Sequence, residues 1–142
     1  MPTANITLAV SNDSNSSCLV ISQPTIGSGG GGNRVRLRNS SSTDTTLIVK
    51  GKGSAPLSLA FTVTGYTMNG TSPMTITGDN ASTNFKDQTV STDGTTVTIT
   101  DIFGNTGPIG GTLPSWSYTL SVKNSAGTVC TIDPGIENEA EP

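Results

Sequence analysis

The 142-residue chain has no histidine, and only 12% of its residues are charged and 4% aromatic. The missing histidine excludes Ser-His-Asp and Cys-His catalysis, histidine zinc sites and the usual general base near neutral pH. The few aromatic residues disfavour a sugar site built from stacked rings. The two least loop-like carboxylates, Asp101 and Asp133, are the remaining candidates for acid-base chemistry. Because histidine is missing and aromatic residues are few, we predict that the protein is not an enzyme and uses no cofactor.

Cysteine is also scarce, with Cys18 and Cys130 as the two examples. Two thiols are too few for a structural zinc site, and their wide separation excludes a CxxC redox pair. Acidic loop residues such as Asp13 and Asp79 are explained by turn formation rather than by calcium binding. We therefore expect no metal site. Two alternatives stay open for the cysteines: a disulfide between Cys18 and Cys130, or two buried free thiols.

Long apolar segments are absent as well, so the sequence predicts no membrane span. The first residues do not combine a basic region with an apolar segment, so we expect no signal peptide. The low content of lysine and glutamate beside abundant Thr, Ser, Asn and Gly is typical of exported or virion-surface proteins, but the compartment stays open. A net charge of −3 and a pI near 4.6 disfavour a nucleic-acid-binding surface.

What the chain does contain is alternation of apolar and polar residues with a period of two, which predicts β-strands. Threonine supports this interpretation because its branched Cβ fits a pleated sheet. Nine segments show the pattern, and the clearest are 57–64, 96–100 and 116–123. Turn residues recur every 8–12 positions, which favours a sandwich over a barrel. We predict an all-β fold: a two-sheet antiparallel β-sandwich of about nine strands, with an immunoglobulin-like architecture.

The alternation also predicts which residues point inward. We expect a core of Leu8, Val20, Val35, Leu37, Leu59, Phe61, Val63, Val97, Ile99, Trp116, Tyr118, Leu120, Val122 and Ile132. Residues 1–134 form one sandwich domain in this prediction, with a flexible glycine-rich loop at 27–33, and 135–142 form an acidic C-terminal tail. Asp93-Gly94 suits a type I′ hairpin turn, and Gly127 suits a left-handed position in a second turn.

Basic residues gather in one part of the chain. We define the basic strip as Arg34, Arg36, Arg38, Lys50 and Lys52, which are five of the seven basic residues. Alternation places the three arginines on one strand face. The strip is a solvated face, a docking site for the acidic tail within one chain or between neighbours, or a site for a sulfated or phosphorylated ligand. Exposed ion pairs contribute little stability, so tail docking would serve regulation or assembly.

The function expected from these features is a non-catalytic interaction or assembly module that uses loops, a sheet face or a strand edge. Self-association or a protein partner fits this role, because an exposed strand edge accepts another strand. The alternative is a carbohydrate- or anion-binding domain that uses the basic strip.

The last eleven residues, 132–142, read Ile-Asp-Pro-Gly-Ile-Glu-Asn-Glu-Ala-Glu-Pro. This segment resembles the ending of the bacterial DP-EP family, in which an Asp-Pro pair is followed by an acidic stretch and a Glu-Pro pair. Asp133-Pro134 and Glu141-Pro142 are the matching positions. The resemblance implies a small β-rich protein, and it implies no site residue.

Overall fold

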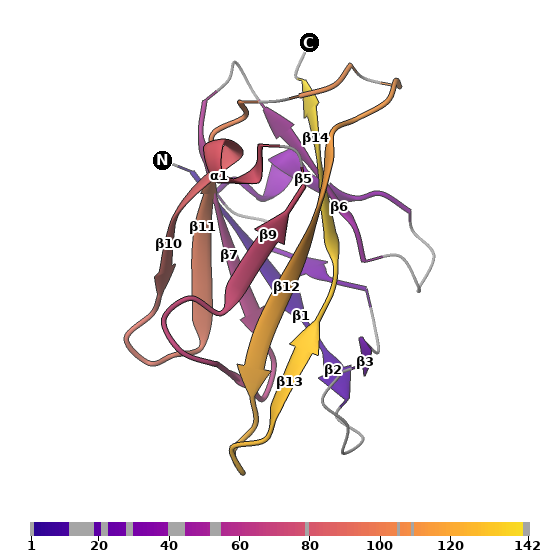
Figure 1. Cartoon of the computed structure of the whole chain (residues 1–142). Coiled ribbons are helices and arrows are strands. Elements are labelled where there is room, and N and C mark those ends of the chain that lie inside the picture. The colour runs from indigo at the N-terminus through magenta and orange to yellow at the C-terminus, as the bar shows by residue number, and fades with distance from the viewer. Residues whose placement is uncertain are drawn as a thin grey trace.

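The computed structural model describes residues 2–11, 19–20, 23–27, 30–39, 45–51, 55–78, 80–104, 106–108 and 110–140. Within them the chain is almost entirely β-structure, and two sheets lie face to face (Figure 1). The predicted all-β sandwich is confirmed. No helix in the described part of the chain is long and apolar enough to cross a membrane.

The first sheet has five strands. Their order across the sheet is β10 (Phe85–Val90), β11 (Thr96–Asp101), β7 (Leu57–Val63), β1 (Thr3–Leu8) and β4 (Thr25–Ile26). Strands β1 and β7 are parallel, whereas the other neighbours in this sheet are antiparallel.

The second sheet has seven strands. Its main path is β13 (Val129–Ile132), β12 (Ser115–Lys123), β14 (Gly135–Ala140), β6 (Leu47–Gly51) and β5 (Val35–Leu37). Two further strands, β8 (Thr67–Met68) and β9 (Met74–Thr77), also pair with β12. Strands β14 and β6 are parallel.

Four small elements complete the described structure. Strands β2 (Val10–Ser11) and β3 (Leu19–Val20) form a separate antiparallel pair. A 3-10 helix, η1 (Gly32–Arg34), precedes β5, and a single helical turn, α1 (Ala81–Asn84), precedes β10.

The core lies between the two large sheets and follows the predicted alternation. Phe61 on β7 packs against Tyr118 on β12, and Phe85 on β10 packs against Trp116 on β12, with ring centroids 5.2 and 5.1 Å apart. Every predicted core residue whose side chain is described is buried, except Leu37, which is partly buried. The side chain of Val20 lies outside the described residues.

Most neighbouring strands are antiparallel as expected, but each sheet also contains one parallel pair. Both sheets are mixed, because β1 pairs in parallel with β7 and β14 pairs in parallel with β6. Parallel neighbours need a long connection between them. The segment between β1 and β7 supplies one such connection, since it contributes β5 and β6 to the other sheet. The structure also divides the β-structure into more and shorter strands than the nine predicted segments.

The glycine-rich segment packs closely against β1 where it is described, and the flexibility expected of 27–33 stays a prediction. Gly27 N–H donates to the Asn5 carbonyl oxygen and Gly31 N–H to that of Thr3. Gly31 and Gly32 are buried, and a Cβ on Gly32 would collide with the Gly27 carbonyl oxygen. Residues 28 and 29 lie outside the described part of the chain.

The two predicted turns differ in outcome. Gly127 has the expected positive φ of 84°. In the β10–β11 turn, Gly94 has a φ of 75° whereas Asp93 does not have a positive φ, so the turn is not type I′. Instead the Asp93 carboxylate accepts hydrogen bonds from Thr95 N–H and from the Ser91 hydroxyl, which fixes a wider turn.

Candidate functional site

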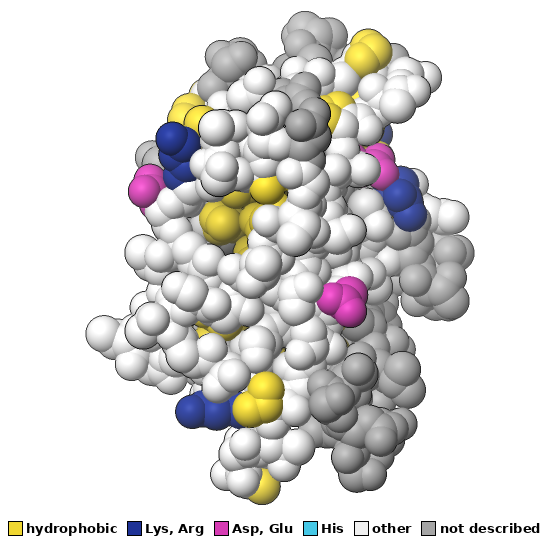
Figure 2. All heavy atoms as spheres, viewed as in Figure 1, with side chains coloured by type: hydrophobic (Ala, Val, Ile, Leu, Met, Phe, Trp, Pro, Cys, Tyr) yellow, Lys and Arg dark blue, Asp and Glu magenta, His cyan; other side chains and the backbone are white. Residues whose placement is uncertain are grey.

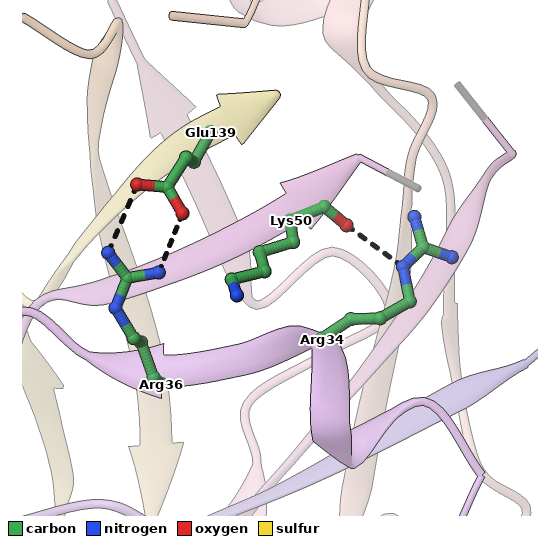
Figure 3. Close-up of polar contacts among 4 residues, drawn as sticks. All are labelled: Arg34, Arg36, Lys50 and Glu139. Carbon is green, nitrogen blue, oxygen red and sulfur yellow. Dashed lines mark hydrogen bonds and ion pairs between the residues drawn. The ribbon is translucent and has the colours of Figure 1, made fainter. Parts of the chain in front are cut away.

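The basic strip does not stay together in the folded chain. Arg36 and Arg38 extend from β5 and its end, and Lys50 lies on the neighbouring strand β6. Arg34 is buried at the end of η1 and points to another environment (Figure 3). Lys52 lies outside the described residues. The structure therefore brings Arg36, Arg38 and Lys50 to one face and separates Arg34 from them.

The acidic segment occupies this face. Gly135–Ala140, which the sequence assigned to a tail, forms strand β14 inside the seven-stranded sheet. Arg36 donates two hydrogen bonds to the Glu139 carboxylate, Nη1–Oε1 at 2.8 Å and Nη2–Oε2 at 3.1 Å (Figure 3). Arg38 Nη1 lies 2.8 Å from Glu137 Oε2. Both carboxylates reach across β6, which separates β14 from β5.

The two ion pairs differ in exposure. The Glu139 side chain is 3% exposed and that of Glu137 15%, while both arginine side chains are nearly half exposed. The hydrogen bonds from Arg36 hold the pKa of Glu139 below its usual value, and they raise the pKa of Arg36. Strand β14 of the same chain thus already engages Arg36 and Arg38, two of the cations that could have bound an external anion.

Arg34 connects several segments of the folded chain. Its Nε donates to the Lys50 carbonyl oxygen and its Nη2 to that of Ala55, both at 2.8 Å. Its guanidinium also lies over the Phe103 ring, 5.0 Å from the centroid. A planar, multiply donating guanidinium suits this task of joining several chain segments.

A buried polar cluster lies near Arg34 and centres on Asp101, at the end of β11. Asp101 Oδ1 accepts hydrogen bonds of 3.0 Å from Asn84 Nδ2, Asn138 Nδ2 and Phe103 N–H. Asp101 is fully buried, and desolvation raises its pKa to about 6. Its Oδ2 has no hydrogen-bond partner among the described residues. The cluster joins α1, β11 and β14.

The other candidate carboxylate, Asp133, lies apart from Asp101. Asp133 is exposed and accepts a hydrogen bond from the Thr119 hydroxyl. It precedes β14, and five positions of extended chain, or roughly 17 Å, separate it from Asn138, whose side chain bonds to Asp101. The structure therefore does not bring these two carboxylates together. The described residues also hold no group of three or more metal-ligating side chains.

One of the two cysteines lies among the described residues. Cys130 lies on β13 and is fully buried. Cys18 lies outside the described residues. The disulfide between Cys18 and Cys130 stays a prediction.

A hollow of about 460 Å³ lies at the opposite end of the sandwich from α1. We call it the turn-end hollow; it is lined by 62–67, Thr95 and 123–125. These residues come from the end of β7 and its turn into β8, from the β10–β11 turn, and from the end of β12. Figure 1 shows the three turns together at the lower end of the molecule. In Figure 2, basic and apolar side chains lie next to each other at this end.

The walls of the turn-end hollow are mainly apolar. Tyr66 is half-buried, packs against the core and supplies the aromatic surface. Lys123 is the one charged residue among the described lining residues, and it is exposed. A concave, apolar site with few polar groups is the usual form of a binding site.

A smaller hollow of about 180 Å³ lies where the edges of the two sheets approach each other. We call it the seam hollow; its apolar walls include Met74 on β9 and Phe85 on β10. The Gln88 carboxamide bridges the gap: its Oε1 accepts from Met74 N–H and its Nε2 donates to the Met74 carbonyl oxygen, both at 2.9 Å. These are the hydrogen bonds that a peptide group of an added strand would make, so Gln88 closes this edge.

Comparison of the sequence with models of protein families and with curated proteins gives no match. The resemblance of the C-terminal segment to the DP-EP family therefore stays a prediction.

The sequence predicts some of these features and not others. It groups the arginines in the basic strip, but it does not predict the turn-end hollow. The hollow is made by three turns that are far apart in the sequence, and no local pattern marks their convergence. The acidic residues on β14 could have been found by their period of two, because Glu137 and Glu139 alternate with inward-facing Ile136 and Asn138.

Proposed function

We propose that the protein is a non-catalytic interaction module that contacts its partner through the turn-end hollow. The observation that carries this proposal is the hollow itself: a cavity of about 460 Å³ that three turns form on a closely packed sandwich. Loops held by a rigid scaffold are the usual place for recognition. A volume in this range is also typical of binding sites.

The basic strip and the seam hollow are weaker candidates, because polar groups there already bond within the same chain. The arginines of the basic strip bond to Glu137, Glu139 and backbone carbonyls of the same chain. The seam hollow is smaller, and Gln88 already satisfies the Met74 backbone groups beside it. The turn-end hollow is therefore the best candidate surface in the described part of the chain.

A titration followed by NMR tests the proposal. Isotope-labelled protein is mixed with a panel of small probes: an aromatic alcohol, an aromatic amine, an aromatic carboxylate and a monosaccharide. We expect the amide shifts to concentrate in 62–67, 93–95 and 123–126 for at least one aromatic probe. Tyr66→Ala should weaken this binding, since it removes the aromatic wall. Val129→Ala is the control, because Val129 is the large apolar residue that is exposed (41%) outside the hollow.

Two results would contradict the proposal. The first is binding that maps to β5 and β14, which would favour the anion-binding alternative. The second is an absence of shifts at the turns with every probe and with concentrated protein alone, since the latter measurement also tests a second copy of the chain as the partner.

A further inference from the structure

We propose that the turn-end hollow recognises an acidic peptide segment, which places an aromatic or branched apolar side chain in the hollow and a neighbouring carboxylate beside Lys123. This inference rests on the proposed function and adds the chemistry of the partner. It follows from three properties of the lining: which polar groups are already bonded, where the charge lies and what shape the walls have.

The first property is that much of the lining's hydrogen-bonding capacity is already used. The Thr62 hydroxyl bonds to that of Thr96 at 3.0 Å, and the Thr95 hydroxyl donates to the Asp93 carboxylate at 2.8 Å. Asn124 Oδ1 accepts from the backbone N–H groups of its own turn, those of Ala126 and Thr128. The lining is mainly apolar, and the residues that contribute to it include several threonines, Tyr66 and Lys123.

Such a surface suits an apolar group better than a sugar. A sugar ring presents many hydroxyl groups, and each one that loses water without gaining a partner costs free energy. An aromatic or branched apolar side chain has no such cost and gains by leaving water. The tyrosine ring also favours an aromatic partner, since offset or edge-to-face ring pairs add attraction beyond the area that they bury.

The second property is the charge of the rim. Lys123 is the last residue of β12, and its side chain is the one charged group among the described lining residues. Asp93, in the β10–β11 turn, is held within that turn by three hydrogen bonds from Ser91 and Thr95 and is not among the lining residues. The charge of the described lining is therefore that of Lys123, and its ammonium group favours a ligand with a carboxylate at the mouth of the hollow.

The third property is the shape of the site. Three turns surround an open depression rather than a closed cavity, and Gly65 has nothing within 4 Å of an added Cβ. An open depression admits one side chain from a chain that continues past it on both sides. This favours a peptide segment over a small molecule that must be enclosed.

Two capped dipeptides test the inference: N-acetyl-Phe-Asp-amide and N-acetyl-Phe-Asn-amide, which differ in one charge and hardly in shape. We expect the aspartate peptide to bind the wild-type protein about fivefold more tightly at low salt, because a single exposed ion pair contributes up to about 1 kcal/mol. The difference should shrink as salt is added. Lys123→Met, which keeps the apolar stem, should abolish the preference, and Lys123→Arg should keep it. Lys86→Met on β10 is the matched control, since Lys86 is exposed and lies outside the lining.

The outcomes separate this inference from the proposed function. If both dipeptides bind at the turns with equal affinity, the acidic partner is overturned and the interaction module stands. If neither dipeptide shifts the amide signals of the turn residues while the aromatic probes do, the claim that the partner is a peptide is overturned. Tighter binding of glucuronate than of the aspartate peptide would make the hollow a sugar site. If nothing binds at the turns, both proposals fail.

Discussion

Arg36 donates two hydrogen bonds to Glu139, although 103 positions separate the two residues in the sequence. The contact crosses strand β6 and joins β5 to β14. Arg38 and Glu137 repeat the relationship one step along the same strands, with more exposure of the carboxylate. The C-terminal strand is therefore held to the sheet by charge as well as by backbone hydrogen bonds.

The Arg36–Glu139 pair should contribute measurably to stability. Glu139→Gln should lower the free energy of unfolding by about 1–2 kcal/mol, since it replaces a charge-assisted bidentate contact with a neutral one. Glu137→Gln is the matched control and should cost less, because its pair is more exposed. Urea denaturation at pH 7 measures both values.

The pH dependence of this effect has a definite sign. The pKa of Glu139 is lowered in the folded chain, so its contribution is present above the unfolded pKa and is lost as the pH falls through the folded value. The unfolding curves of the wild type and Glu139→Gln should converge below about pH 4. A constant difference down to pH 2 would contradict this origin of the stability.

Asp101 should give stability the opposite pH dependence. Burial raises its pKa to about 6, so between about pH 4 and 6 the folded chain binds a proton that the unfolded chain releases. Stability should therefore rise as the pH falls from 7 to about 4.5, by about 2 kcal/mol from this group. Asp101→Asn should flatten the dependence in this window, and Glu139→Gln should leave it in place. Chemical denaturation at several pH values checks the slope, and stability that rises with pH across the window would contradict the assignment.

Gln88 should protect the seam between the two sheets. Gln88→Ala leaves the Met74 N–H and carbonyl oxygen without their side-chain partner and should cost about 1–2 kcal/mol. It should also promote self-association, because it opens a strand edge next to apolar surface. Thr89→Ala on the same strand is the control, since Thr89 is exposed. Denaturation and light scattering at two concentrations measure both effects, and unchanged stability with an unchanged mass would show that Gln88 is dispensable.

Gly32 should tolerate no side chain. Gly32→Ala places a Cβ against the Gly27 carbonyl oxygen, which is backbone and cannot turn away, so we expect a loss of more than about 2 kcal/mol. Gly104→Ala is the control: it has only ordinary contacts, 3.7 Å from Asn84 Oδ1, and no positive φ. Thermal unfolding of the two variants compares them, and equal melting temperatures would contradict the close packing of this segment.

The inward-facing residues could be predicted from the sequence, because successive side chains of a strand point to opposite faces whichever strands lie beside it. Leu59, Phe61 and Val63 are buried as their spacing requires, and so are Trp116, Tyr118 and Leu120. Leu37 is only partly buried because β5 lies at the edge of its sheet. The period of two therefore determines the face of each strand but not how completely it is covered.

The sequence by itself determined that this chain builds an all-β sandwich, since alternation, turn residues and composition act locally and agree with one another. Only the tertiary structure decided that β1 and β14 run parallel to a neighbour, that Glu139 meets Arg36, and that three turns enclose a hollow beside Tyr66 and Lys123. Each of these depends on which strands become neighbours. That choice is made by the packing of segments far apart in the chain, and no short stretch of sequence contains it.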